Sequence, residues 1–303
     1  MKHLLKLMDL SKEEIFSILD LGDKLKYERK NGISHRVLEG KTLGMIFQKS
    51  STRTRVSFEV GMYQLGGHAL FLSSRDLQIG RGEPVQDTAR TLSRYLDGIM
   101  IRTYEQAEVE GLAQYGSIPV INGLTDYAHP CQVLADLMTI REYKGGFDGL
   151  KLSFIGDGNN MANSLIVGGI KAGMSVTVAC PPGYQPDAEI MAWAYASGRF
   201  ACVSDIFSAA ENADVLYTDV WASMGQEAEA IERAKDFSGY QIGRALMEHA
   251  KPDAIVLHCL PAHRDEEITT EIFEKHAAEI FDEAENRLHA QKAVMVKLMG
   301  ENN

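Results

Sequence analysis

The chain has 303 residues, 45% of them hydrophobic and 24% charged, and no apolar stretch near the roughly 20 residues that a membrane helix needs. This mixture argues against widespread disorder, and the length predicts two domains. The formal net charge of -11 argues against a general nucleic-acid or anionic-membrane surface, although a small anion needs only a local cluster of arginines and backbone N–H groups.

The first predicted element is an amphipathic helix over residues 11–30. Ser11 is a capping residue, Glu14 follows three positions later, and apolar residues recur at helical spacing. After Gly40, short β-rich runs alternate with longer helical patterns, which is typical of a parallel sheet covered by helices. We expect strands near Thr42–Phe47, Ala69–Leu72, Ile99–Arg102 and Ile118–Ile121.

The glycine-rich stretch Lys144–Gly149 separates this series from a second one. The sequence therefore predicts an α/β protein with one domain over residues 1–143 and another over residues 150–283. Residues 284–303 hold a continuous helical pattern that is long enough to return across the first half. Strands of the second half are expected near Lys151–Ile155, Ser175–Ala179, Val215–Thr218 and Ala254–Leu257.

The run Ser50–Arg55 lies between an apolar strand and a helical pattern. A strand-to-helix turn directs several backbone N–H groups at one point, where hydroxyls and a guanidinium can complete a cage for a phosphate. The alternative is an ordinary helix cap beside solvated arginines. The absence of G-x-x-x-x-G-K-[ST] argues against a Walker-type nucleotide loop.

Three more polar sites lie at the ends of predicted strands, where α/β proteins usually bind ligands. Arg102 ends one strand, His129–Gln132 opens a helix, and Asn159-Asn160 follows another strand. Singly, a surface ion pair would explain Arg102 and a buried hydrogen-bonding role would explain His129. Their convergence is what indicates a ligand site. Gly156–Asn160 lacks the third glycine of a dinucleotide loop, so NAD is only weakly indicated.

Two motifs follow strands of the second half: Asp219 with Ser223–Gly225, and His258–Pro261. Taken alone, Cys259 fits a small core residue. The His–Cys neighbours at 129/131 and 258/259 lack the ligand spacing of structural zinc, so we expect no metal.

The four cysteines and the first ten residues bear on the cellular location of the protein. No C-x-x-C spacing occurs among the four cysteines, and residues 1–10 lack the long apolar run and cleavage site of a signal peptide. Reduced thiols and a cytoplasmic location are therefore expected. The cysteines are Cys131, Cys180, Cys202 and Cys259.

Ser51–Arg55 and His129–Gln132 resemble the Ser-Thr-Arg-Thr-Arg and His-Pro-x-Gln motifs that aspartate and ornithine carbamoyltransferases share. The two motifs of the second half, Asp219–Gly225 and His258–Pro261, resemble the ornithine branch of that family. Gln78 and Arg287 match as well, so the resemblance covers nearly the whole chain.

The resemblance implies a first domain that binds carbamoyl phosphate, a second that binds ornithine, and a last helix that packs back on the first domain. It also implies a homotrimer, or a multiple of trimers, with no cofactor. Catalytic roles are implied for Arg102, His129, Asp219 and Cys259, and ornithine contacts for Asn160, Asp219, Ser223 and Met224. Carbamoyl phosphate contacts are implied for Ser51, Thr52, Arg53, Thr54, Gln78, Arg102, His129, Pro130, Cys131, Gln132, Cys259, Leu260 and Arg287.

The implied reaction is attack of the ornithine side-chain amine on carbamoyl phosphate, giving citrulline and phosphate. That amine has an unperturbed pKa near 10, so the site must favour its neutral form. Hydrogen-bond donors at Thr54, Arg102 and His129 would stabilise the oxyanion. The proton acceptor is open between Cys259 and the departing phosphate. Proximity of the two substrates can supply much of the acceleration, so neither a metal nor a covalent intermediate is required.

Several alternatives stay open. Aspartate carbamoyltransferase is disfavoured because its second-substrate motif is missing. A carbamoyltransferase for putrescine would need no groups for an α-carboxylate, and a non-catalytic homologue that senses the ligands could lose Cys259 or Asp219, which are both present. The same chemistry serves arginine synthesis or arginine breakdown, and the compact length favours the biosynthetic type by resemblance.

Overall fold

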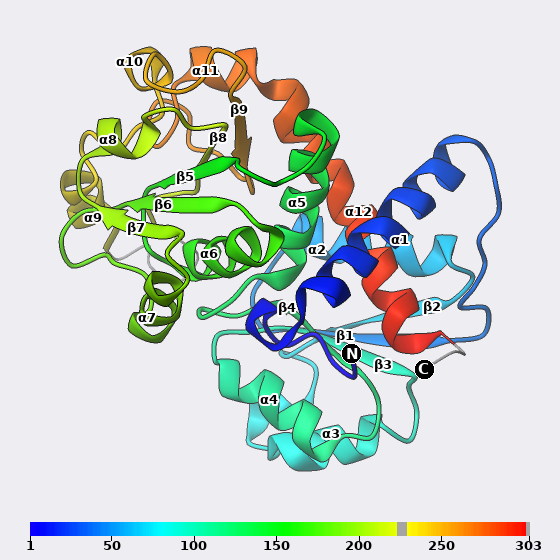
Figure 1. The fold of residues 1–303 in the computed structure, drawn as a ribbon. Helices are drawn as coiled ribbons and strands as arrows, with labels where there is room; N and C mark the ends of the chain where they lie inside the picture. The colour runs from blue at the N-terminus through cyan, green and yellow to red at the C-terminus, as the bar shows by residue number, and fades with distance from the viewer. Residues whose placement is uncertain (223–228, 301–303) are drawn as a thin grey trace. The chain divides into compact units, whose positions relative to one another are not determined.

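The computed structural model describes residues 1–222 and 229–300, and it divides the chain into two compact units (Figure 1). The first unit holds Met1–Met138 together with the chain from Asn286 onward, and the second holds Thr139–Glu285. Each contains a parallel sheet flanked by helices, which confirms the predicted fold class. Both boundaries fall inside long helices, α5 (Pro130–Lys144) and α12 (Ala277–Met299). Within the described residues, no helix is long and apolar enough to cross a membrane.

The first unit is built on a four-stranded parallel sheet in the order β2-β1-β3-β4. Apolar side chains of β1, β3 and β4 pack against α3 and α4 on one face, and Figure 1 shows α1 and α12 on the other. The strands are β1 (Thr42–Phe47), β2 (His68–Ser73), β3 (Gly98–Arg102) and β4 (Val120–Leu124). The helices are η1 (Leu7–Asp9), α1 (Lys12–Lys30), α2 (Thr52–Gln64), η2 (Gln78–Arg81), α3 (Val85–Leu92) and α4 (Gln106–Tyr115).

The capping box predicted for α1 is present. The Ser11 hydroxyl accepts from the Glu14 N–H at 3.1 Å, and the Glu14 carboxylate accepts from the Ser11 N–H at 2.9 Å. Together the two side chains satisfy backbone donors that the first helical turn leaves without partners.

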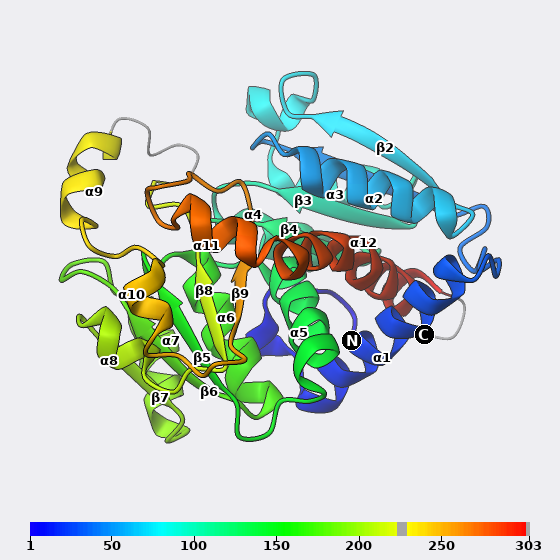
Figure 2. The same cartoon turned by 90° about the horizontal axis from the view of Figure 1, so that it is seen from above.

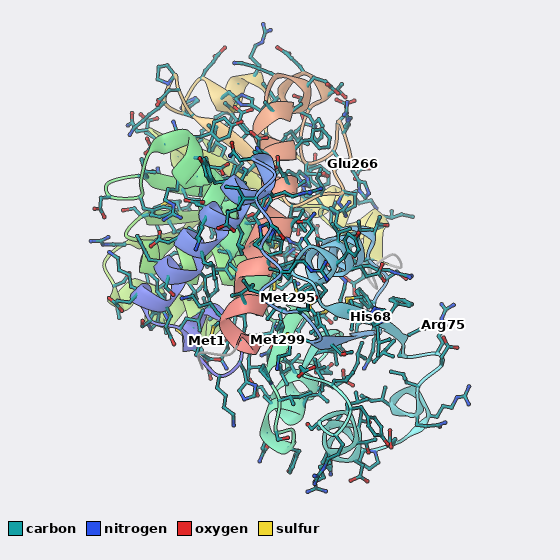
Figure 3. All side chains as sticks on the ribbon, turned by 90° about the vertical axis from the view of Figure 1, so that its right-hand side faces the viewer. Met1, His68, Arg75, Glu266, Met295 and Met299 are labelled. Atoms are coloured by element: carbon teal, nitrogen blue, oxygen red, sulfur yellow. The ribbon has the colours of Figure 1, made fainter. Side chains whose placement is uncertain are left out.

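Helix α12 returns to the first unit, as predicted. A Cβ at Gly61 of α2 would lie 2.9 Å from the Met295 side chain, so the glycine allows the two helices to approach closely. Met299 lies against Gly98 at the start of β3, and Figure 3 labels both methionines on the last helix. A hydrogen bond of 2.6 Å from Gln291 to Ser57 joins α12 to α2 again. The last helix is therefore part of the core of the first unit.

A polar cluster is buried where α12 meets α2. The Lys292 side chain is fully buried, with its Nζ atom 2.8 Å from His35 Nε2 and donating to Gln64 Oε1 at 3.0 Å. His35 Nδ1 lies 3.3 Å from the Glu28 carboxylate. Burial lowers the pKa of Lys292 to about 8, because the interior disfavours the charged amine.

This shift predicts that the protein becomes more stable as the pH rises. Between about pH 8 and about pH 10 the unfolded chain still protonates Lys292 while the folded chain does not, so the free energy of unfolding should increase across that window. Urea denaturation over this range checks the trend, with Lys292→Met as the comparison. The variant should show a smaller increase than the wild type. An identical pH dependence in both proteins would contradict the prediction.

The second unit is built on a five-stranded parallel sheet in the order β7-β6-β5-β8-β9. Apolar residues of its central strands pack against α8, α10 and α11. The strands are β5 (Lys151–Ile155), β6 (Ser175–Ala179), β7 (Phe200–Val203), β8 (Val215–Thr218) and β9 (Ile255–His258). The helices are α6 (Asn160–Ala172), α7 (Ala188–Ala196), α8 (Ile206–Ala210), α9 (Ala230–Asp236), α10 (Arg244–Met247) and α11 (Thr270–Lys275).

Strands β2, β3 and β9 differ from the predicted bounds by one residue at one or both ends, and three further details differ. Strand β7 was not predicted, because four half-buried residues at a sheet edge give neither an alternating nor a long apolar pattern. Strand β4 begins at Val120 instead of Ile118, since Pro119 has no N–H for the ladder. Helix α12 begins at Ala277, seven residues before residue 284.

The strand order reverses once in each sheet. The chain runs from β1 outward to β2 and then returns to β3, and in the second unit it runs from β5 to β6 and β7 before returning to β8. Crevices outside the carboxyl ends of strands at such reversals are where open α/β sheets bind ligands. The polar motifs of the sequence follow β1, β3, β5 and β8, so each unit has a candidate site of this kind.

Candidate active site

In the first unit, Ser51 fixes the turn between β1 and α2. Its backbone is extended, and its hydroxyl accepts from the Thr54 N–H at 3.1 Å as the N-cap of α2. The other N–H groups of the first turn carry the positive end of the helix dipole, which favours an anion. Thr52 is exposed and Arg53 half-buried. The turn therefore presents a hydroxyl and a guanidinium beside backbone donors.

Two buried arginines meet at the hydroxyl of Thr54. Arg102 Nη1 lies 3.4 Å from Thr54 Oγ1, and Arg287 Nη2 lies 3.2 Å from the same atom. Arg287 also donates to Gln132 Oε1 at 2.6 Å. Two like charges held close together in a buried site repel, so the arrangement favours a bound anion between them. We refer to Ser51–Thr54, Arg102, His129, Gln132 and Arg287 as the anion cradle.

His129 lies inside this cradle as a neutral imidazole. Burial lowers its pKa well below the ordinary value, and the positive charges of Arg287, Arg102 and Arg53 lower the pKa further. A neutral imidazole can still donate one N–H to a developing negative charge. The Ser51–Arg55 motif, Arg102 and the His129–Gln132 motif therefore meet in the first unit, together with Arg287, whereas Asn159-Asn160 belongs to the second unit.

Five predicted carbamoyl-phosphate residues lie outside the cradle, and two of them, Cys259 and Leu260, belong to the second unit. Pro130 begins α5, and the thiol of the fully buried Cys131 faces the Asn122 carbonyl oxygen at 3.4 Å. Burial raises the pKa of Cys131 to about 12, so this thiol is inert and only the backbone at Pro130 and Cys131 suits ligand binding. Gln78 is exposed at the start of η2.

In the second unit, three motifs meet around the carboxylate of Asp219. Cys259 Sγ donates to Asp219 Oδ1 at 3.0 Å, and the Val220 N–H donates to the same oxygen at 2.8 Å. Asn159 Nδ2 donates to Asp219 Oδ2 at 3.1 Å. Asn160 is buried in the first turn of α6. A carboxylate so placed, next to a thiol and two amides, is suited to a ligand that carries an ammonium group.

A buried histidine fixes the chain on both sides of Cys259. His258 Nδ1 accepts from the Leu260 N–H at 2.9 Å, so the ring proton lies on Nε2, which is 3.0 Å from the Glu267 carboxylate. Glu283 accepts from the His258 N–H at 2.9 Å. Leu260 has a φ of 58°, and the bond to Pro261 is cis. The side chain of Cys259 is thus held in one place by its neighbours.

Comparison with known proteins agrees with this geometry. The carbamoyl-P binding domain of the aspartate/ornithine carbamoyltransferases matches residues 2–142, and their Asp/Orn binding domain matches residues 148–298. The ornithine carbamoyltransferase of Pelobacter propionicus is 57% identical, covering 99% of each chain. That of Thermococcus kodakarensis is 55% identical over 99% of this chain and 96% of its own. The chain belongs to the ornithine carbamoyltransferase family.

Solved structures of this family have the same fold. The ornithine carbamoyltransferase from Pyrococcus furiosus superimposes with a TM-score of 0.95 at 54% identity, covering 100% of this chain and 98% of that one. The anabolic enzyme from Campylobacter jejuni gives a TM-score of 0.93 at 45% identity, covering 98% of this chain and 99% of that one. The resemblance inferred from the motifs is therefore confirmed, and the ornithine branch with it.

Some residues of the family pattern cannot be placed. Ser223, Met224 and Gly225, predicted to contact ornithine or to surround it, lie outside the described residues. Residues on the two sides of that segment contact each other, because Arg233 of α9 donates to the Trp221 carbonyl oxygen at 2.9 Å. Arg233 also donates to the Asp157 carboxylate at 2.7 Å.

Sequence reasoning missed the supporting contacts of this family site. Asn159 lies in the Asn159-Asn160 pair that the sequence marks as part of a ligand site, but its contact with Asp219 is not predicted. Glu267 and Arg233 belong to none of the predicted motifs. The available signal was local: Asn159 directly precedes the helical pattern, as an N-cap does. Arg233 contacts Asp157 across 76 positions, and spacing gives no sign of such a contact. Glu267 lies nine positions from His258, outside any predicted helix or strand.

One group of side chains in the described residues has the composition of a cation site: His263, Glu266 and Glu267. Glu267 Oε1 already accepts from the His263 N–H at 2.6 Å and lies beside His258. These contacts explain where the buried carboxylate sits without an ion, and they tie it to the Cys259 segment.

Proposed function

We propose that the protein transfers the carbamoyl group of carbamoyl phosphate to the side-chain amine of L-ornithine, giving L-citrulline and phosphate. The observation that carries the proposal is the meeting of two buried guanidiniums at Thr54, beside the N-terminus of α2. Membership in the ornithine carbamoyltransferase family supports the proposal. The chain carries the two motifs that aspartate and ornithine carbamoyltransferases share and the two motifs of the ornithine branch. Carbamoyl phosphate is the anion of the cradle in this proposal.

Each part of carbamoyl phosphate has a chemical match in the cradle. The N–H groups and side chains of Ser51–Thr54 suit the phosphate, because a helix N-terminus and a guanidinium both favour multiple anionic oxygens. Arg102, His129 and Thr54 are the donors for the carbonyl oxygen, which becomes an oxyanion when the amine attacks. Arg287 and Gln132, which are hydrogen-bonded to each other, contact the remaining polar groups of carbamoyl phosphate.

Ornithine is assigned to the groups around Asp219. The carboxylate matches the α-ammonium, and Asn160 supplies an amide. In the reaction the amine lone pair forms the new C–N bond, the C–O bond to phosphate breaks, and phosphate leaves with that electron pair. The amine proton goes to the departing phosphate, or to the Cys259 sulfur as the thiol passes its own proton to Asp219 Oδ1.

Steady-state citrulline formation tests the proposal, with ornithine, putrescine and aspartate compared in parallel. A site with polar groups for the α-carboxylate, which putrescine lacks, should prefer ornithine over putrescine in kcat/KM by on the order of 10⁴. Equal use of putrescine would point to the amine-specific alternative. Tight binding of both ligands without turnover would point to a ligand-sensing homologue.

We also propose that the protein is a homotrimer or a multiple of trimers. Strand β2 is the outer edge of the first sheet (Figure 2), and its Leu70 and Phe71 are exposed beside Val56 and Tyr63 of α2. An apolar edge strand of this kind favours cover by another chain. Figure 3 labels His68 and Arg75 at the two ends of this edge. Light scattering on the purified protein is the test, and a fully active monomer would exclude the assembly.

The physiological direction and location complete the proposal. We propose a cytoplasmic enzyme of arginine synthesis, supported by relatives named anabolic, including those of Pyrococcus furiosus and Campylobacter jejuni. The four cysteines are all free thiols in the structure, in keeping with a reducing compartment.

A further inference from the structure

Asn159 joins the start of α6 to the carboxylate of Asp219. We propose that Asn159 is a positioning residue for ornithine: its amide fixes the orientation in which Asp219 receives the ammonium group. The inference rests on the proposed function and adds a residue that belongs to none of the assigned ligand contacts. Three sets of contacts carry it.

The first set fixes the amide of Asn159. Its Oδ1 atom accepts from the N–H groups of Met161 at 2.9 Å and Ala162 at 3.3 Å, as the N-cap of α6. Only an amide oxygen can accept these donors, so the NH₂ group must point the other way, toward Asp219. The helix cap thereby determines which atom faces the site.

The second set fixes the backbone that carries Asn159. The Gly158 N–H donates to the Tyr184 carbonyl at 2.9 Å, and a Cβ at Gly158 would lie only 2.3 Å from the Pro186 nitrogen. No other residue fits there without moving the chain. The Asn159 N–H donates to the Asp157 carbonyl at 2.7 Å, which tightens the turn. Asn159 therefore starts from a rigid support.

The third set fixes Asp219 itself. Oδ1 accepts from Val220 N–H and from the Cys259 thiol, while Oδ2 accepts from Asn159. With one donor on Oδ2 and two on Oδ1, the carboxylate cannot rotate without losing hydrogen bonds. Oδ2 keeps acceptor capacity for an ammonium, because each carboxylate oxygen can accept two hydrogen bonds. A preset acceptor loses less free energy on binding than one that must be ordered.

Asn159→Asp separates the positioning role from the helix cap. Aspartate caps a helix as well as asparagine does, so the contacts to Met161 and Ala162 can persist. The variant loses the donor and places a second carboxylate against Asp219. Two carboxylates this close share a proton, which raises the pKa of one of them. At acidic pH the shared proton restores an O–H donor, and at alkaline pH two negative charges face each other.

We expect the ornithine KM of Asn159→Asp, divided by that of the wild type, to rise with pH. The ratio should reach about 10-fold to 100-fold near pH 8 and be several-fold smaller near pH 6, with kcat changing less than KM. Taking the ratio at each pH cancels the protonation of ornithine itself. Among the described residues, the ionisable groups nearby include Cys259, the Asp157–Arg233 pair and Glu229, which pairs with Arg233, and they are common to both proteins.

Two further variants complete the experiment. Asn159→Ser keeps a capping hydroxyl but has no donor long enough for Asp219, so its KM ratio should be raised without the pH dependence. It carries the test if Asn159→Asp fails to fold. Asp187→Asn is the matched control, because Asp187 caps α7 through the N–H groups of Glu189 and Ile190 in the same unit. It should leave the ornithine KM unchanged.

The possible failures are distinguishable. A wild-type protein that makes no citrulline from ornithine overturns the proposed function. An active wild type with a pH-independent KM ratio near one for Asn159→Asp overturns the role of Asn159. A KM increase for Asn159→Asp that matches that of Asp187→Asn would show that the effect is common to Asn/Asp exchanges at helix N-caps of this unit, and it also overturns the inference. Binding of L-norvaline, which lacks the side-chain amine, provides the same comparison by calorimetry without turnover.

Discussion

Arg53→Ala is expected to weaken the binding of carbamoyl phosphate by about 10²-fold or more, because it removes a charged donor from the phosphate end of the cradle. Arg53 lies in the first turn of α2, where backbone N–H groups also point at the anion. Its positive charge, like those of Arg287 and Arg102, contributes to the lowered pKa of His129. Calorimetry with phosphonoacetamide, a non-reactive analogue, measures the loss.

Two variants make this measurement specific. Arg53→Lys keeps the charge but not the planar fork of donors, so its affinity should fall between those of the wild type and Arg53→Ala. Arg90→Ala removes an exposed arginine of α3 that pairs with Asp87, and it should bind normally. Near-normal affinity of Arg53→Ala would mean that the phosphate is bound elsewhere.

His129→Ala should lower kcat by about 10²-fold to 10³-fold, the usual effect of losing one oxyanion donor. The acid-side behaviour follows from the lowered pKa of His129: the imidazole is neutral in the folded protein at neutral and mildly acidic pH. The ratio of wild-type to variant kcat should therefore stay constant from about pH 6 to about pH 8.

Stopped assays at several pH values with both substrates saturating give this ratio. His249→Ala is a suitable control, since His249 is exposed and pairs with Glu211. A ratio that changes steeply near the ordinary histidine pKa would show that His129 acts in its charged form. The neutral-donor assignment would then be wrong.

Most of the fold and the outline of the site could be predicted from the sequence because both depend on local patterns. Apolar runs of the right length gave β1, β5, β6 and β8 with the bounds that the structure has. The edge strand β7 has no such pattern. Motifs at strand ends indicated both sites because parallel strands bring their carboxyl ends to one edge of a sheet.

What the sequence could not give is which side chains meet across long separations. Arg287 contacts Gln132 across 155 positions and Thr54 across 233. Its assignment to carbamoyl phosphate came from family resemblance, since no spacing argument links it to either residue. No spacing argument links Asn159 to Asp219 either, because they lie 60 positions apart. These pairs depend on packing, and packing appears only in three dimensions.

The place of Arg287 on the last helix has a consequence for how the enzyme is made. The other residues of the anion cradle are all translated by residue 132, whereas Arg287 follows 155 positions later. A growing chain can form the sheet of the first unit early, but it lacks one of the two guanidiniums that meet at Thr54. Full affinity for the anion therefore arises only after α12 has been translated, and a chain cut short before α12 would lack it.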